Sequence, residues 1–192
     1  MQMTIENGQL RGAEQWASPN FGDRPAGTQI DLVVVHSISL PPGEYGGDAI
    51  PRFFCNQLSR DEHPYYSEIA DLTVSAHLLI RRTGDILQFV NFDSRAWHAG
   101  RSSYEDRDEC NDYSIGIELE GTDEDVFEDV QYDALVAVIT ALVDAYPALG
   151  ISRVVGHSDI APGRKTDPGS GFDWQRVRLA LERVRSSHSA SA

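Results

Sequence analysis

The chain has 192 residues, of which 30 are Asp or Glu and 16 are Lys or Arg, so its formal net charge at pH 7 is −14. Proteins that bind nucleic acid usually present a basic surface to the phosphates, and this acidic chain is therefore not expected to bind DNA or RNA. A hydrophobic content of 41% with 24% charged residues is ordinary for a globular protein. We expect a single domain.

The first residues lack both the basic stretch and the apolar stretch of a signal peptide, and no window approaches the ~18 apolar residues of a membrane span. Cys55 and Cys110 are the only cysteines, which is too few for a disulfide framework, and neither lies in a C-x-x-C motif. We expect a monomeric cytoplasmic protein with two reduced thiols and no contact with a membrane.

The first half of the chain predicts one buried strand and one hairpin. Residues 30–36 form a continuous β-branched run, typical of a strand buried on both faces, and this strand is expected to end at His36. The segment after it is rich in Pro and Gly and predicts a loop. A short helix is expected around residues 48–58, and a β-hairpin with arms at 76–81 and 85–90.

The second half of the chain predicts an alternating strand and two helices. Residues 114–120 place apolar side chains on one face and Glu118 and Glu120 on the other. Residues 130–146 follow the helical i, i+3, i+4, i+7 pattern. A short strand at 153–156 leads to His157, and Asp173 is expected to cap a last helix.

These elements predict an α/β fold, with one central mixed β-sheet flanked by helices. The small polar residues 186–192 predict a disordered tail, because they bury too little surface to offset the entropy of ordering. Residues 1–185 are therefore expected to form the domain.

Two histidines and one aspartate have the composition of a zinc site. His36 and His157 each end a short strand and open a loop, where α/β sheets usually place their ligands. With Asp167 they would supply three ligands and leave a fourth position for water. Separations of 121 and 10 residues match no local zinc motif, so from spacing alone a structural role for the histidines stays open.

Three further features have both a chemical and a structural interpretation. Glu118, in mid-strand, is either a general base or part of a solvated face. Lys165, in a Pro/Gly-rich loop, either stabilises an oxyanion or is simply exposed. Trp97 and His98, just before Gly100, form either the wall of a ligand pocket or a half-buried aromatic anchor.

Taken together, several segments resemble the AmpD family of 1,6-anhydro-N-acetylmuramyl-L-alanine amidases, which shares its fold with phage amidases and peptidoglycan recognition proteins. The similarity runs in order from about residue 18 to the last helix. It is carried by residues 33–44, 74–77, 95–100, 110–123 and 156–169.

The resemblance implies roles for individual residues. It places His36, His157 and Asp167 on the zinc ligands, Glu118 on the catalytic glutamate and Lys165 on the lysine that stabilises the transition state. The implied reaction is hydrolysis of the amide between the lactyl group of 1,6-anhydro-N-acetylmuramic acid and L-alanine in an anhydromuropeptide, in peptidoglycan recycling. The expected substrate contacts are Ser37, Trp97, His98, His77 and Arg107, with a supporting or structural role as the alternative for His77 and His98.

Thr73 and Glu109 stand where relatives can carry arginine. If those arginines bind peptide carboxylates, we expect either a weaker affinity for the peptide in this chain or binding through Arg107 and Arg101. Two other functions remain open. The first is a metal-free peptidoglycan-binding module on the same fold, against which the presence of all three ligands argues. The second is an exported amidase that cuts the polymeric wall, against which the absence of a signal peptide argues.

Overall fold

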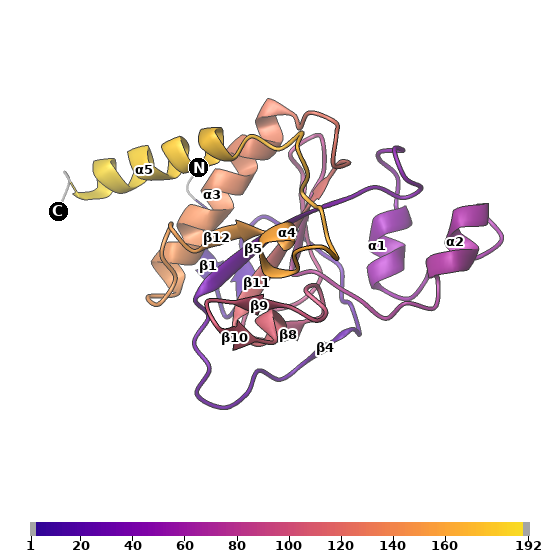
Figure 1. Ribbon diagram of the computed structural model, residues 1–192, viewed down its shortest axis with the longest axis horizontal. Helices are drawn as coiled ribbons and strands as arrows, with labels where there is room; N and C mark the ends of the chain where they lie inside the picture. Colours follow the sequence, from indigo (N-terminus) through magenta and orange to yellow (C-terminus); the bar gives the residue numbers. More distant parts are fainter. Residues whose placement is uncertain (1–2, 190–192) are drawn as a thin grey trace.

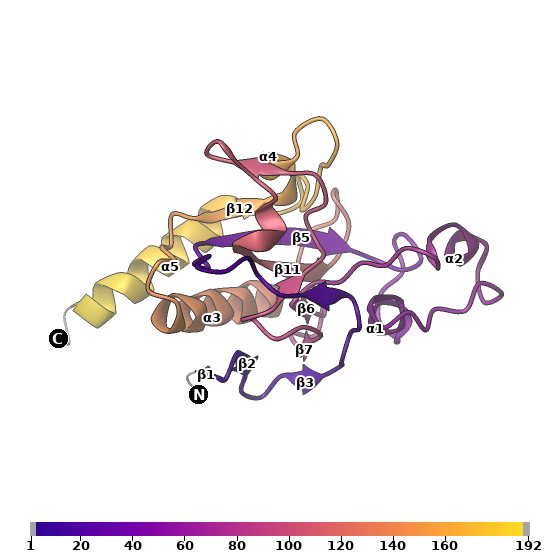
Figure 2. The ribbon, with the colours of Figure 1, turned by 90° about the horizontal axis from the view of Figure 1, so that it is seen from below.

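A six-stranded mixed sheet lies at the centre of the protein (Figures 1 and 2). The computed structural model describes residues 3–189. The sheet has the strand order β12-β5-β11-β6-β7-β3, in which β11 runs parallel to both β5 and β6, and β6 and β7 form the expected antiparallel hairpin. The strands are β3 (Glu14–Gln15), β5 (Leu32–Ile38), β6 (Leu78–Ile80), β7 (Ile86–Gln88), β11 (Ser114–Glu120) and β12 (Val154–Gly156).

Two long helices, α3 (Asp129–Ala145) and α5 (Trp174–Ser189), cover one face of the sheet (Figure 1). Their apolar sides pack on the alternating side chains of β5 and β11, which confirms the predicted apolar face of residues 114–120. Asp173 caps α5, because its Oδ1 accepts a hydrogen bond from the backbone N–H of Arg176 at 2.9 Å. The fully buried residues of this layer include Val33, Val35, Ile115, Ile117, Leu119, Leu135, Val138, Ile139 and Leu142.

The opposite face carries two short helices, α1 (Ala49–Phe54) and α2 (Pro64–Ile69), which lie together at one end of the molecule (Figure 1). The helix predicted at residues 48–58 is shorter, because the chain leaves the helical conformation at Asn56, where φ is +58°. Helix α2 was not expected. It has Pro64 at its first position, and the ring of His63 accepts the backbone N–H of Tyr65 at 3.1 Å.

Other predicted boundaries also move in the structure. The strand expected at residues 30–36 runs over Leu32–Ile38, so His36 lies inside β5 and not at its end. Helix α5 continues to Ser189 and so includes the first four residues of the expected tail, whereas residues 190–192 lie outside the described part. The hydroxyl of Ser186 donates to the carbonyl of Glu182, one turn earlier in the helix.

The remaining elements are short and connect the main layers. Within residues 3–189, no helix is both long and apolar enough to span a membrane. Both cysteines are buried free thiols. The short elements are β1 (Ile5–Glu6), β2 (Gln9–Leu10), β4 (Phe21–Gly22), β8 (Arg95–Ala96), β9 (Ser103–Tyr104), β10 (Arg107–Asp108), the 3₁₀ turn Cys110–Asp112, and α4 (His157–Ile160).

Candidate active site

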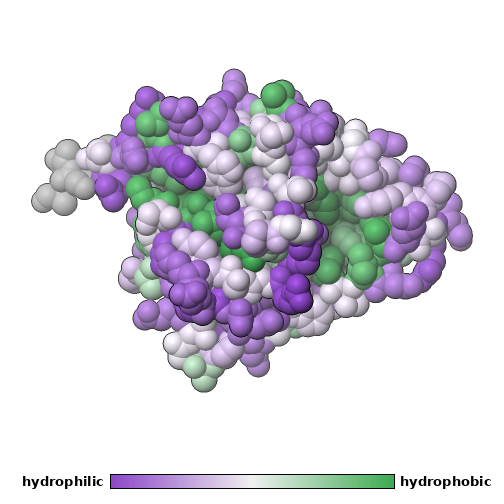
Figure 3. All heavy atoms as spheres, viewed as in Figure 1, coloured by the Kyte–Doolittle hydropathy of each residue, from purple (hydrophilic) through white to green (hydrophobic). Residues whose placement is uncertain are grey.

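A cavity of about 460 Å³ opens between the sheet and helices α1 and α2. Figure 3 shows hydrophobic side chains gathered in this hollow, between the body of the molecule and the two helices. One wall is apolar and includes Phe53, Phe54, Tyr65 and Ile69. The opposite wall is polar and carries the candidate metal ligands, so the cavity combines an apolar surface with a few converging polar groups, as ligand sites do.

Three neighbouring strands deliver the polar groups. In the parallel pair of β5 and β11, His36 and Glu118 are register partners and therefore point to the same face. Strand β12 lies on the other side of β5 and leads directly into α4, whose first residue is His157. The loop after α4 returns to this point, because the backbone N–H of Ser158 donates to the carbonyl of Asp167 at 3.0 Å.

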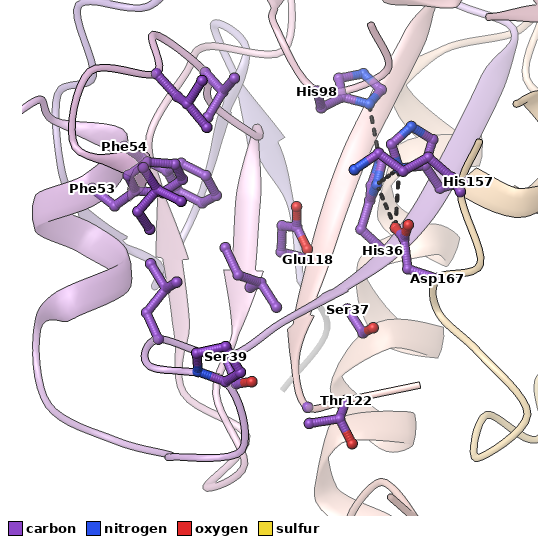
Figure 4. A pocket seen from close by; sticks show the side chains of 18 of the residues that line it. His36, Ser37, Ser39, Phe53, Phe54, His98, Glu118, Thr122, His157 and Asp167 are labelled. Carbon is purple, nitrogen blue, oxygen red and sulfur yellow. Dashed lines mark hydrogen bonds and ion pairs between the residues drawn. The ribbon is translucent and has the colours of Figure 1, made fainter. Parts of the chain in front are cut away.

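The side chains of His36, His157 and Asp167 meet at one point (Figure 4). The Nδ1 atoms of the two histidines are 2.9 Å apart, and Oδ2 of Asp167 lies 3.1 Å from the first and 3.0 Å from the second. Both rings are almost fully buried. The three groups come from segments far apart in the sequence, and the fold confirms that they are neighbours.

The chemistry of these donor atoms fits zinc. A zinc ion with ligand bonds of 2.0–2.1 Å holds its ligand atoms about 3.3 Å apart in tetrahedral geometry, which is close to the observed separations. Burial lowers the pKa of His36 to about 4, so its imidazole is neutral at pH 7, as a metal ligand must be. Asp167 supplies the third donor atom as a carboxylate oxygen, a common ligand of zinc.

Glu118 lies between the phenylalanines of α1 and the three candidate ligands (Figure 4). Within the described residues its Oε2 is buried and has no hydrogen-bond partner. Burial and the nearby charge of Asp167 raise the pKa of this carboxyl well above 4.5, whereas Lys165 lowers it. A carboxyl with a raised pKa at the wall of a cavity is typical of a catalytic acid or base.

Lys165 also lines the cavity, with an exposed side chain. It is the only lysine of the chain, where all other basic residues except histidine are arginine. Its charge acts on both Glu118 and His36, since it lowers the pKa of each. The ammonium group is thus within electrostatic reach of the candidate catalytic and metal-binding groups.

Three of the expected substrate contacts lie at the cavity: Ser37, Trp97 and His98. Ser37 follows His36 on β5, and its hydroxyl donates to Oδ1 of Asp123 at 3.3 Å, so part of its hydrogen-bonding capacity is already used. The ring of His98 approaches the metal ligands, with its Nδ1 3.0 Å from Nε2 of His36. It is therefore placed to act on His36 as well as on a ligand.

His77 lies outside the cavity, which corrects the expectation that it contacts substrate. Its ring is completely buried, and among the described residues it is not part of the cavity lining. Its Nδ1 accepts the backbone N–H of Gly116 at 3.0 Å, and its Nε2 lies 3.1 Å from the carbonyl of Ser94 and 3.2 Å from the guanidinium of Arg24. His77 therefore joins segments of the interior, the structural alternative for this residue.

Arg107, another expected substrate contact, lies apart from the cavity lining. It lies on the hairpin of β9 and β10, and within the described residues it does not line the cavity. Its guanidinium makes two contacts of 2.9 Å with the carboxylate of Asp31 and lies over the ring of Tyr113, 3.9 Å from the ring centre. Both partners hold it beside the starts of β5 and β11, since Asp31 and Tyr113 directly precede these strands.

Glu120 shares a face of β11 with Glu118 but has a different role. Its carboxylate is buried and accepts the backbone N–H groups of Gly46 at 2.6 Å and Arg82 at 3.1 Å. These bonds hold the loop before α1 and the turn after β6. Sequence alternation placed both glutamates correctly on one face, but only Glu118 reaches the cavity.

Sequence reasoning missed two parts of this site. The first is the apolar wall, because α2 was not expected. The second is Asn111, whose Oδ1 accepts the backbone N–H groups of His98 at 3.0 Å and Ala99 at 2.8 Å and so fixes the segment beside the metal ligands. Gly116 was a signal for the ring of His98 and not for Asn111, since a glycine inside a β-branched strand often marks a close approach by another group.

Comparison with known proteins agrees with this geometry. The AmpD 1,6-anhydro-N-acetylmuramyl-L-alanine amidase of Escherichia coli is 52% identical over 94% of this chain and 98% of its own length. A crystal structure of an AmpD selenomethionine derivative has a TM-score of 0.91 at 52% identity, over 93% of this chain and 99% of the other. AmpDh3 from Pseudomonas aeruginosa, solved in complex with an anhydromuramic pentapeptide, has a TM-score of 0.59 at 30% identity, over 81% of this chain and 61% of the other.

Residues 26–170 match the Amidase_2 family, described as N-acetylmuramoyl-L-alanine amidase. This range contains all three candidate metal ligands together with Glu118 and Lys165. On the match to the family and the near-complete coverage by close relatives, the chain belongs to the N-acetylmuramoyl-L-alanine amidase family.

Proposed function

We propose that this protein is a zinc-dependent amidase that cleaves the bond between the lactyl group of 1,6-anhydro-N-acetylmuramic acid and L-alanine in anhydromuropeptides. The observation that carries the proposal is the convergence of His36, His157 and Asp167 beside Glu118 in one cavity. The names of the relatives and the anhydromuramic peptide bound to AmpDh3 support the substrate class. The reaction belongs to peptidoglycan recycling.

His36, His157 and Asp167 would hold the metal. A zinc ion bound there supplies Lewis-acid chemistry, because it polarises the scissile carbonyl and lowers the pKa of a water molecule. Two neutral imidazoles and one carboxylate leave the loaded site with a net positive charge. That local charge suits an anionic peptide substrate in spite of the net charge of −14 on the whole chain.

Glu118 would take the proton of the attacking water and pass it to the nitrogen of the leaving L-alanine. Its Oε2 has no competing hydrogen bond within the described residues, so the carboxylate is free to accept that proton. The raised pKa of this carboxyl makes it a stronger base than an exposed glutamate, and the charge of Lys165 prevents the pKa from rising further.

Lys165 would stabilise the negative oxygen that develops when water adds to the amide carbonyl. A substrate seated against the apolar wall formed by α1 and α2 would displace water from that side of the cavity. Exclusion of water strengthens each of these charge interactions, because the local dielectric constant falls. We further propose that the protein acts as a cytoplasmic monomer, and the two buried free thiols fit a reducing compartment.

The decisive experiment is incubation of the purified protein with an anhydromuramoyl tripeptide, followed by mass spectrometry. The expected products are free anhydro-N-acetylmuramic acid and the intact tripeptide. Treatment with a chelator should abolish the reaction, and one equivalent of zinc should restore it. Binding of the substrate without cleavage would instead identify a binding module, and faster release of peptide from intact sacculi would identify a wall-degrading amidase.

A further inference from the structure

The segment His98–Ala99 contacts both candidate histidine ligands. Nδ1 of His98 lies 3.0 Å from Nε2 of His36 (Figure 4), and the carbonyl oxygen of Ala99 lies 3.1 Å from Nε2 of His157. In each case the contact is made on the ring nitrogen that points away from the metal position. One short segment therefore touches the outer side of both rings.

The hydrogen-bond directions can be assigned from Ser114 onward. The hydroxyl of Ser114 donates to the carbonyl of Cys110 at 2.6 Å, so its single proton is used there. The contact of 3.1 Å between Ser114 Oγ and His98 Nε2 must then be donated by the Nε2–H of His98. A neutral His98 with its proton on Nε2 has an unprotonated Nδ1, which can only accept.

The same logic fixes the proton of His36. Because Nδ1 of His98 is an acceptor, Nε2 of His36 must carry the proton in their contact, and Nδ1 of His36 is left with its lone pair. For His157 the result is the same, since the Ala99 carbonyl can only accept and so selects the Nε2–H form. Both Nδ1 lone pairs then face the point where Oδ2 of Asp167 also lies.

The surrounding structure holds this segment in place. Asn111 accepts the backbone N–H groups of both His98 and Ala99 through a single oxygen. A Cβ atom at Gly116 would lie 2.4 Å from Cγ of His98, so β11 leaves room for the imidazole only because this position is glycine. Asn111 in the 3₁₀ turn and Gly116 in β11 thus independently place the ring of His98.

We propose that His98 is a positioning residue for His36 and that, together with the Ala99 carbonyl, Ser114 and Asn111, it holds both histidine ligands in the Nε2–H tautomer and so sets the zinc affinity of the site. The inference rests on the metal site of the proposed function and adds residues whose task is the orientation of its ligands. Partners of this kind orient ligating imidazoles and increase their basicity. His98 then lines the cavity because it is placed beside His36.

The test compares two substitutions of His98. His98→Phe keeps a ring of similar size but removes the acceptor for Nε2–H of His36, and we expect zinc affinity to fall about 10- to 100-fold. His98→Asn can present its amide oxygen near the position of Nδ1, and most of the lost affinity should return. Zinc affinity is measured by competition with a chromophoric chelator. His63→Asn is the control for loss of a histidine, because Asn keeps the helix cap of α2.

A second set of measurements does not depend on His98 substitutions. Ser114→Ala removes the acceptor of the His98 Nε2–H bond, and Gly116→Ala displaces the ring, so both should weaken zinc binding in the same direction. In the metal-free full-length protein, ¹⁵N chemical shifts should show both His36 and His157 as Nε2–H tautomers. Circular dichroism confirms that each variant is folded before its affinity is interpreted.

The outcomes separate the inference from the proposed function. Failure of the wild-type protein to bind stoichiometric zinc would refute the proposed function itself. Wild-type zinc affinity in folded His98→Phe, or an Nδ1–H form of His36 in the metal-free protein, would refute the inference alone. Equal losses in His98→Phe and His98→Asn would also overturn it, because the acceptor would then be irrelevant.

Discussion

Glu118 and His36 are register partners on the parallel strands β11 and β5, and both side chains point into the same cavity. The proposed general base and one proposed metal ligand are thereby held side by side by the backbone hydrogen bonds between these two strands. The central sheet thus carries two of the proposed functional groups, helix α4 adds His157, and loops add Asp167, Lys165, Trp97 and His98. This arrangement predicts that the catalytic and metal-binding roles can be separated by mutation.

We expect Glu118→Gln to lower kcat by about 10²- to 10⁴-fold, because a general base of this kind contributes that much to the rate. Zinc content should remain one ion per chain, since Glu118 is not one of the three converging ligands. Product formation is followed by mass spectrometry and zinc by elemental analysis. Exposed Glu124→Gln is the matched control. Wild-type turnover by Glu118→Gln would remove this residue from the mechanism.

Substitution of a proposed metal ligand is expected to remove the zinc itself. His36→Ala should lose stoichiometric zinc and with it all amidase activity. Zinc at 100 times its dissociation constant should stabilise the wild-type protein by about 2.7 kcal/mol and raise its Tm, because only the folded state binds the ion. The same zinc concentration should leave the Tm of His36→Ala unchanged. A zinc-dependent increase in the Tm of that variant would show that the ion binds elsewhere.

The sequence predicted the elements whose hydrophobic pattern is local. The alternation of residues 114–120 and the helical period of residues 130–146 both correspond to observed elements, β11 and α3, within one or two residues. The three candidate metal ligands are a weaker prediction from spacing, since 121 residues separate the two histidines. Only the family resemblance assigned them roles, and the fold then brought them within hydrogen-bond distance.

His77 and Arg107 show what sequence alone could not decide. Each role depends on contacts with residues distant in the chain: His77 with Arg24 and Gly116, and Arg107 with Asp31. A histidine near a pocket motif and an arginine in a polar loop are both typical of residues that contact a ligand. The neighbouring sequence does not reveal the distant residues that bury the histidine or pair with the arginine. Helix α2 was missed for a related reason, because six residues are too few to show a helical period.

Lys165 offers a chemical test, because it is the only lysine in the chain. Acylation with an amine-specific reagent at high pH should modify this side chain and reduce kcat by about 10²- to 10³-fold, the usual effect of losing one oxyanion donor. Lys165→Met should lose activity to the same extent and become insensitive to the reagent. Its exposed position predicts an unchanged Tm. Activity that survives complete modification of Lys165 would contradict the proposed role.

Trp97 and Arg107 should behave in opposite ways. Trp97 lines the cavity, so Trp97→Ala is expected to raise KM with a smaller effect on kcat. Arg107→Ala should leave both constants unchanged and reduce the free energy of unfolding by about 0.5–1 kcal/mol, the value of a partly exposed ion pair. Steady-state kinetics and urea unfolding measure the two effects. A raised KM in Arg107→Ala would show that this residue reaches the substrate after all.

His77 predicts a specific dependence of stability on pH. Burial, helped by the charge of Arg24, lowers the pKa of its imidazole to about 3, whereas the unfolded chain titrates near 6.5. Between pH 3 and pH 6.5 the unfolded state binds more protons at His77 than the folded state does. The contribution of neutral His77 to the free energy of unfolding is therefore complete above pH 6.5 and is lost as the pH falls toward 3. The loss assigned to this group between pH 7 and pH 4 is up to about 3 kcal/mol. His77→Gln should be less stable at pH 7, yet lose less stability on acidification than the wild-type protein. Urea unfolding at a series of pH values measures both slopes, and parallel curves for the two proteins would show that His77 does not stay neutral in the folded state.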